Sequence, residues 1–325
     1  MSMKYVKQKG LLVRFSPLVF YPDGQNAIMT PPVNDEEREI CMAVSVGVMR
    51  DGDAWNSCML EDGHVLESLA FESAASALAY VERVCVDYPE LSLAISLESE
   101  TPFLALSAIS DQHLESISIG TDDVLDEQQA HELLIAMRNI NLHSFLMPSI
   151  KYLPGVPVYR KLLRATLGTS NDVCAVAALL YRLREREATW PEMHFLCVRV
   201  GDQRRSIQVV EEGQIVNGIA ASTQLVVQEE LQAFYEQALW EGLTQDMAGL
   251  MAVHHIEDIV VLGKYQDALS EYFADKYQVY LFPANEADMV GREAALGAAI
   301  IAEGLYLPGL ASEVVERLHI REAIA

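Results

Sequence analysis

The sequence feature that most constrains the fold is a repeated pattern of three short apolar runs separated by two polar turns. One copy spans residues 42–66 and the other spans residues 195–216. Each copy has two turns, at residues 50–53 and 61–64 and at residues 201–204 and 211–214. Because glycine accepts the positive φ that tight hairpins require, both copies predict a three-strand antiparallel meander.

Alternating helical and strand-like segments follow each meander. Apolar residues recur near a 3.6-residue period at residues 73–86, which predicts a helix. Further helices are predicted at residues 224–250, 265–273, 294–305, which are rich in alanine, and 310–318. Short apolar runs bounded by turn residues predict strands at residues 91–97, 259–263 and 277–282. A meander followed by helices and strands, found twice, predicts an α/β protein of two lobes, each with a mixed sheet opened by a three-strand antiparallel meander. We expect the two lobes to meet at a cleft.

The length of the chain agrees with two lobes, because 325 residues exceed what a single core usually supports. We expect an N-terminal extension at residues 1–40, a first lobe at residues 41–165 and a second lobe at residues 166–325. Turn residues around short apolar pieces predict an added hairpin in the extension.

The charge balance limits the classes of partner. The chain has 47 Asp and Glu against 23 Lys and Arg, a net charge of -24, which repels the phosphate backbone of nucleic acids. No apolar run approaches the roughly 20 residues that cross a bilayer. Five widely spaced cysteines without a CxxC motif are typical of reduced thiols. We therefore expect a cytoplasmic protein that binds neither nucleic acid nor membrane.

A cationic segment interrupts this acidic chain. Residues 133–171 contain no Asp or Glu, but they include Arg160, Lys161 and Arg164. The planar fork of arginine recognises carboxylate and phosphate, and Thr169 precedes an apolar helical run whose first N–H groups can face the same anion. These four residues predict a site for a small anionic molecule. The alternative is a basic surface helix followed by an ordinary capped helix.

The same segment carries a family resemblance. The run LPGVP at residues 153–157, the cations Arg160, Lys161 and Arg164, and the run LGT at residues 167–169 resemble the signature of the predicted butyrate kinases. That family belongs to the superfamily of acetate and sugar kinases, chaperones and actin, and weaker similarity covers most of residues 41–318. The resemblance implies two ribonuclease-H-like lobes closing on ATP and Mg²⁺, and phosphorylation of a small carboxylic acid or a similar small molecule.

The resemblance also implies positions for a nucleotide site. Glycines that would contact the nucleotide are expected at Gly47, Gly52, Gly201, Gly218 and Gly263. The acids nearest to the family's catalytic positions are Asp51, Asp53 and Asp202. Asp51 and Asp53 also suit the tip of a hairpin, where aspartate is common without any catalytic role. No separate metal site is predicted.

Three nucleotide motifs depart from the family pattern. Met49 stands where the family has its metal-binding Asp, and Arg199 stands in the strand where the family has Glu. The sequence NGIAAS at residues 217–222 replaces Asp-Gly-Ile-Gly-Gly-Thr. An ATP-dependent kinase, a noncatalytic kinase-fold homologue acting in ligand binding or assembly, and an acidic oligomeric scaffold therefore all stay open. We expect a homodimer, and in the scaffold alternative residues 310–318 with the neighbouring apolar surface form its interface.

Overall fold

The structure is a computed structural model, and it describes residues 44–52, 54–110, 112, 114, 117, 124–140, 143–163, 166–201, 204–223, 232–284 and 290–324. Residues 42–325 form one compact unit. The hairpin predicted in residues 1–40 lies outside the described residues. In the part that is described, no helix is long and apolar enough to cross a membrane.

The first sheet has six strands in the order β3-β2-β1-β4-β6-β5. Its antiparallel meander consists of β1 (Val44–Asp51), β2 (Ala54–Glu61) and β3 (His64–Phe71). The strands β4 (Ser92–Ser96) and β6 (His143–Leu146) continue the sheet in parallel from β1, and β5 (Leu104–Ala105) is antiparallel to β6.

The second sheet has five strands in the order β11-β10-β7-β8-β9. Its meander consists of β7 (Phe195–Val200), β8 (Arg204–Glu211) and β9 (Gln214–Ser222). The strands β10 (Asp258–Leu262) and β11 (Gln278–Leu281) continue it in parallel from β7. The α/β class and the two mixed sheets, each opened by a three-strand antiparallel meander, are thus confirmed.

The second turn of each meander has the same backbone conformation. Asp62 and Gly63 have φ of 50° and 77°, and Glu212 and Gly213 have φ of 51° and 78°. These positive values at two successive residues suit the right-handed twist of a hairpin. The pairing register then shifts at equivalent places, between residues 59 and 60 and between residues 209 and 210. The predicted duplication therefore extends to the details of the turns.

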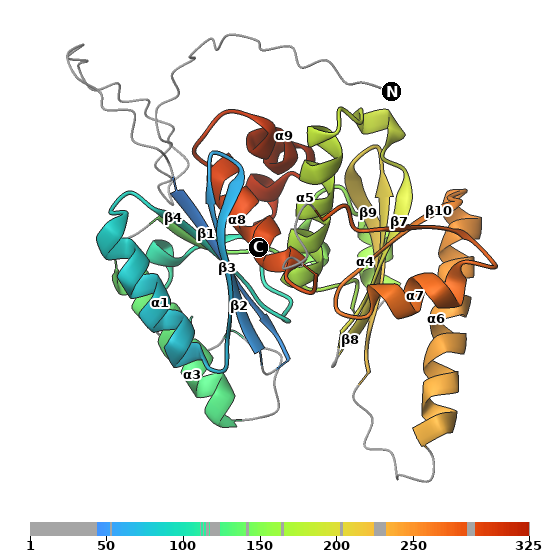
Figure 1. The fold of residues 1–325 in the computed structure, drawn as a ribbon, viewed down its shortest axis with the longest axis horizontal. Coiled ribbons are helices and arrows are strands. Elements are labelled where there is room, and N and C mark those ends of the chain that lie inside the picture. The colour runs from blue at the N-terminus through green and yellow to red at the C-terminus, as the bar shows by residue number, and fades with distance from the viewer. Residues whose placement is uncertain are drawn as a thin grey trace. The chain divides into compact units, whose positions relative to one another are not determined.

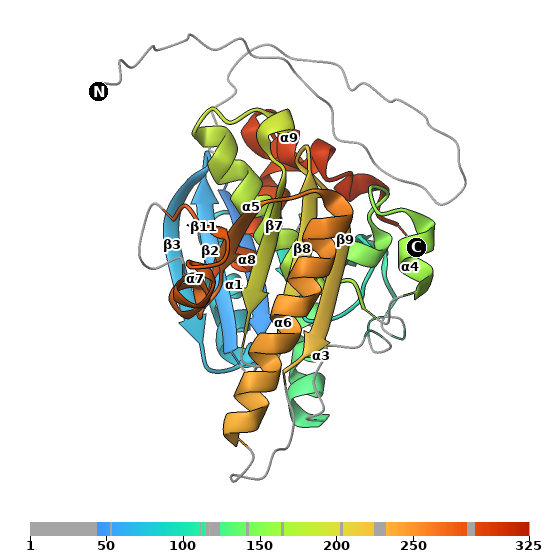
Figure 2. The ribbon, with the colours of Figure 1, turned by 90° about the vertical axis from the view of Figure 1, so that its right-hand side faces the viewer.

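Helices form three layers around the two sheets (Figure 1). The outer face of the first sheet is covered by α1 (Ala74–Asp87) and α3 (Val124–Asn139). The outer face of the second sheet is covered by α6 (Gln232–His254) and α7 (Gln266–Phe273), and α6 crosses β8 (Figure 2). Between the sheets lie α5 (Ser170–Glu185) and α8 (Glu293–Gly304). Because helices cover both faces of the sheets, β1 and β7 are buried almost throughout.

Shorter helices complete the described chain. They are α4 (Val158–Leu163), α9 (Leu310–Arg317), and the 3₁₀ turns Leu106–Ala108, Ile150–Tyr152, Trp190–Glu192 and Ile320–Glu322. The helix α9 packs on α5 and α8. Of the helix predicted at residues 224–250, the structure describes the part from residue 232 onward, and that helix continues to His254.

Two glycines allow the central layer to pack closely. A Cβ atom on Gly297 of α8 would lie 1.7 Å from the carbonyl oxygen of Cys174 on α5. A Cβ atom on Gly47 of β1 would lie 2.0 Å from the carbonyl oxygen of Ala295. The helix α8 therefore touches α5 and the first sheet backbone to backbone, and it packs on β1, β2 and β4 although it follows the second sheet in the chain.

Candidate functional site

The candidate site lies where β1, β4, β7 and β10 end. Ligands in open α/β folds bind at the carboxyl ends of such strands. Asp51 is the last residue of β1, Gly201 follows β7 and Gly263 follows β10. A Cβ atom on Gly201 would lie 3.2 Å from Asp51 Oδ1, and a Cβ atom on Gly263 would lie 3.2 Å from Arg199 Cγ. The structure therefore brings Asp51, Gly52, Gly201 and Gly263 together around Arg199.

Arg199 is the centre of this group. Its Nη2 donates to Asp51 Oδ2 at 2.5 Å, and its Nη1 lies 3.7 Å from Asp172 Oδ1 on α5. The side chain is only 7% exposed. Burial lowers the pKa of the guanidinium, but the charges of the surrounding acids Asp51, Asp172, Glu98 and Glu293 outweigh burial and raise it. Arg199 is therefore a permanent positive charge that joins β7 to β1 and α5.

Asp172 holds this arrangement at the start of α5. Its Oδ2 accepts from the backbone N–H of Thr169 at 2.8 Å and from the Thr169 hydroxyl at 3.3 Å. Its Oδ1 accepts from the hydroxyl of Ser206 on β8 at 2.6 Å. The sequence predicts that Thr169 binds an anion. In the structure, its N–H and its hydroxyl group both donate to Asp172 and hold this carboxylate in place.

Glu98 follows β4 and is 2% exposed. Its Oε2 accepts from the backbone N–H of Gly52 at 3.0 Å, while its Oε1 has no hydrogen-bond partner among the described residues. Burial raises the pKa of this carboxyl to about 7, the negative charge of Asp51 adds to the increase, and Arg199 opposes it. Near neutral pH, Glu98 is therefore partly protonated.

Glu293, the first residue of α8, also accepts a hydrogen bond from a glycine N–H of the site. Its Oε1 accepts from the backbone N–H groups of Gly263 at 3.1 Å and of Gly291 at 3.0 Å. Burial raises the pKa of this carboxyl too. The N–H of Gly201 donates to the carbonyl of Arg204 at 2.7 Å. Each of the three predicted nucleotide contacts Gly52, Gly201 and Gly263 thus donates its N–H to an acceptor within the protein.

Gly47 and Gly218 have packing contacts instead. Gly47 lies against α8, as described above. A Cβ atom on Gly218 of β9 would lie 2.1 Å from the carbonyl oxygen of Leu167, and its N–H donates to Asn217 Oδ1 at 2.9 Å. The absence of a side chain at these two positions is therefore explained by close approach of the backbone.

The predicted anion-binding cations donate to backbone carbonyls. Arg160 Nη1 lies 2.7 Å from the carbonyl oxygen of Val216 on β9, and Lys161 Nζ lies 2.9 Å from that of Leu153. Burial lowers the pKa of the Lys161 ammonium. No described contact joins these two side chains to Arg199. Three other predicted site residues, Asp53, Arg164 and Asp202, lie outside the described residues.

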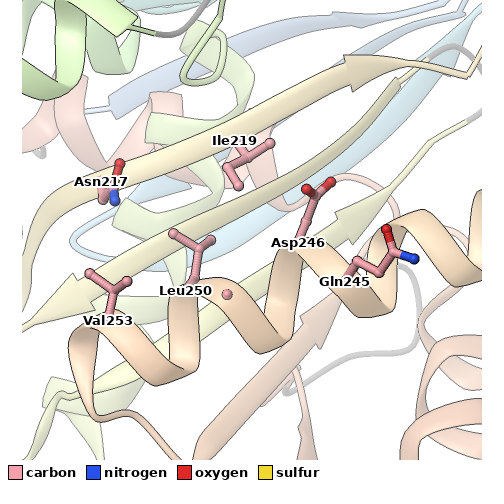
Figure 3. Close-up of a pocket in the computed structure, with 7 residues that line it drawn as sticks. Asn217, Ile219, Gln245, Asp246, Leu250 and Val253 are labelled. Carbon is pink, nitrogen blue, oxygen red and sulfur yellow. The ribbon is translucent and has the colours of Figure 1, made fainter.

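A separate cavity of about 280 Å³ lies between β9 and α6 (Figure 3). It is lined by Asn217, Ile219, Gln245, Asp246, Gly249, Leu250 and Val253. Two of its polar groups have partners in the protein: Asn217 Nδ2 lies 3.0 Å from His254 Nε2, and Asp246 pairs with Arg205 at 3.0 Å. His254 is held by Asn217 and by Glu211, at 2.6 Å. The part of the chain that is described contains no cluster of three or more metal-binding side chains.

Four charged residues lie in the candidate site, and sequence reasoning missed three of them, Glu98, Asp172 and Glu293, and named Arg199 only as a departure from the family pattern. Arg199 carried one signal, because a charged residue between two valines of a buried strand requires a partner. The partners themselves lie in other elements and give no signal at short range in the sequence.

A family model described as "protein of unknown function (DUF1464)" matches residues 58–227, which is more than half of the 325 residues. The chain belongs to this family. The matched part of the DUF1464 chain includes Glu98, Asp172 and Arg199, whereas Asp51 and Glu293 lie outside it. No match was found among curated proteins.

Solved structures similar to this DUF1464 protein include several kinases. An inorganic polyphosphate/ATP-glucomannokinase from Arthrobacter sp. strain KM is 12% identical with a TM-score of 0.44, covering 80% of this chain and 98% of its own. An acetate kinase from Entamoeba histolytica is 6% identical with a TM-score of 0.48, covering 72% and 86%. A protein with actin-like ATPase fold and unknown function from Bacteroides thetaiotaomicron is 11% identical with a TM-score of 0.35, covering 79% and 96%. Similarities at this level give no substrate or activity for the DUF1464 chain.

Proposed function

We propose that this chain is a noncatalytic kinase-fold protein that acts by binding a ligand or a partner protein, and that its own side chains fill its nucleotide site. The observation that supports this proposal is the set of acceptors on the three glycine N–H groups. The carboxylates of Glu98 and Glu293 accept from Gly52 and Gly263, and a backbone carbonyl accepts from Gly201. These acceptors stand in for the oxygen atoms of a nucleotide.

The charges of the site oppose a triphosphate as well. Phosphoryl transfer needs backbone N–H groups and cations aimed at the phosphates. Here the buried guanidinium of Arg199 is held by Asp51 and lies near Asp172. A phosphate approaching Gly52 would meet Glu98, and when Glu98 is ionised, two like charges about 4 Å apart repel each other by about 1 to 4 kcal/mol, depending on solvent exposure. The residues present therefore do not fit Mg-ATP in this arrangement.

The experiment that tests the proposal is thermal unfolding with and without millimolar Mg-ATP. A ligand present at 100 times its dissociation constant stabilises the folded state by about 2.7 kcal/mol, which raises the melting temperature by several degrees. We expect no such increase for this chain, while an active acetate kinase measured in parallel gives one. An increase of several degrees, or ADP release in the presence of a small acid, would contradict the proposal.

A second candidate is ATP-dependent phosphorylation of a small carboxylic acid, as the resemblance to the butyrate kinases implies. Glu98 favours it, because buried carboxyls with a pKa near 7 beside another acid are common at catalytic sites. For this activity Arg199 would turn toward phosphate, and Asp51 would help to hold Mg²⁺. An assay of ADP release with acetate, propionate and butyrate separates the candidates: turnover that is lost in Glu98→Gln supports the kinase.

A further inference from the structure

The short helix α4 carries an unusual apolar surface. Val158, Tyr159 and Leu162 are 68%, 61% and 77% exposed. Among the described residues, no other helix or strand has three exposed large apolar side chains. We call these three side chains, together with the cations Arg160 and Lys161 beside them, the α4 patch. Exposed apolar side chains that gather in one place mark interaction sites more often than those scattered singly.

The backbone beneath the α4 patch is firmly held. The N–H of Arg160 donates to the carbonyl of Pro157 at 3.0 Å, and the side chains of Arg160 and Lys161 donate to the carbonyls of Val216 and Leu153. Leu153 itself is buried in the central core. The exposed side chains therefore stand on a preorganised turn, which lowers the entropy lost when a partner binds.

Two residues of the patch, Tyr159 and Arg160, are of types that contribute strongly to protein interfaces. The Arg160 guanidinium carbon lies 5.5 Å from the centroid of the Tyr159 ring, a cation–π contact at the surface. Tyrosine and arginine are enriched among the residues that contribute most to binding energy. Two apolar side chains, Val158 and Leu162, extend this contact surface.

Charge identifies the chemistry of the partner. Residues 133–171 contain no acid, so no acid close to the patch along the sequence offsets the charges of Arg160 and Lys161 on a chain of net charge -24. Because salt screens charges beyond about 8 Å, a short segment that touches only the patch meets its cations and not the distant acids. An anionic membrane extends over a whole face of the protein and meets those acids, and a symmetric contact with the patch of a second copy would bring cations of the same sign together.

We propose that the α4 patch docks a short segment of a partner protein in which Asp or Glu residues alternate with large apolar side chains. The apolar residues of the partner would cover Val158, Tyr159 and Leu162, and its acids would lie beside Arg160 and Lys161. This inference rests on the proposed noncatalytic binding function and adds the kind of partner that is bound. A separate measurement tests it.

The test uses the full chain carrying a photo-crosslinking amino acid in place of Leu162, expressed in the organism that makes it. Mass spectrometry identifies the crosslinked peptide, and that peptide is then synthesised and titrated into the purified chain. We expect a segment that combines acids with apolar residues. Its affinity should fall about tenfold or more in Leu162→Asp and in Tyr159→Ala, and it should weaken as salt is raised.

The matched control is Val86→Asp on α1, since Val86 is 80% exposed and lies on another element. This variant should bind the peptide as the unchanged chain does, and unchanged melting temperatures show that all variants fold. The proposal is overturned if no crosslink forms, if the crosslinked peptide comes from a second copy, if Leu162→Asp binds normally, or if the chain binds phosphatidylserine vesicles but no peptide. A melting-temperature increase with Mg-ATP would contradict the noncatalytic function, but it would not change the outcome of the peptide-binding test.

Discussion

Arg199 on β7 donates to Asp51 at the end of β1, with Nη2 2.5 Å from Oδ2, and so joins the second sheet to the first across 148 positions of the chain. Asp172 on α5 lies on the other side of the same guanidinium, at 3.7 Å. A single side chain therefore ties together the two sheets and one of the helices between them. In this arrangement, charged side chains of the protein itself occupy the ends of β1 and β7.

Loss of Arg199 should destabilise the fold strongly. Arg199→Met leaves Asp51 and the buried Asp172 without their cation, and breaking a buried ion pair from one side costs about 3 to 5 kcal/mol. The free energy of unfolding in urea at neutral pH measures this loss. Lys151→Ala is the control, because Lys151 pairs with Glu100 at 3.3 Å on the surface, where such a pair contributes about 1 kcal/mol or less. Equal effects of the two substitutions would show that Arg199 does not hold the lobes.

Glu98 should make stability depend on pH. Its pKa rises from 4.5 to about 7 on folding, so the folded state binds more protons between these values, and its contribution to stability falls as pH rises through this window. Glu98→Gln keeps an acceptor for the Gly52 N–H without the charge. Relative to the unchanged chain, this variant should therefore gain about 2 to 3 kcal/mol between pH 5 and pH 8.

Urea unfolding at several pH values measures the change for Glu98. Glu82→Gln, on the exposed side of α1, provides the control and should follow the unchanged chain at every pH. A difference between Glu98→Gln and the unchanged chain that stays constant from pH 5 to pH 8 would show that Glu98 has no raised pKa.

Substitution of two helix glycines by alanine should change the stability of the protein in opposite directions. At Gly297 of α8 a Cβ atom would lie 1.7 Å from a carbonyl oxygen of α5, so Gly297→Ala must push the central helices apart and should cost several kcal/mol or prevent folding. At Gly249 of α6 nothing lies within 4 Å, so Gly249→Ala should stabilise the protein by about 0.5 to 1 kcal/mol. Melting temperatures measure both effects, and equal shifts would refute the close contact between α5 and α8.

The strands and turns were predictable because their signals are local. Gly63 and Gly213 lie in turns of positive φ between apolar runs, and the structure has both hairpins where they were predicted. The strand β6 was not predicted, since a run of only four residues, His143–Leu146, carries no readable periodicity. Local patterns thus identify the meanders, and they miss the short strands β5 and β6 that complete the first sheet.

The candidate site was less predictable, because its contacts join distant parts of the chain. The sequence marks Arg160 and Lys161 as cations but does not reveal the carbonyls of Val216 and Leu153 that accept from them. It marks Gly47 as a candidate nucleotide contact but does not reveal α8, which follows the second sheet and packs on the first. Long-range packing of this kind is decided by the whole fold, so only the structure assigns these partners.

The most direct measurement is a crystal structure grown with Mg²⁺ and a nonhydrolysable ATP analogue at millimolar concentration. We predict that Glu98 still accepts from Gly52, that Glu293 still accepts from Gly263, and that no nucleotide lies between the sheets. A triphosphate bound to the N–H groups of Gly52 and Gly201, with Arg199 turned away from Asp51, would contradict the conclusion that the protein fills its own nucleotide site.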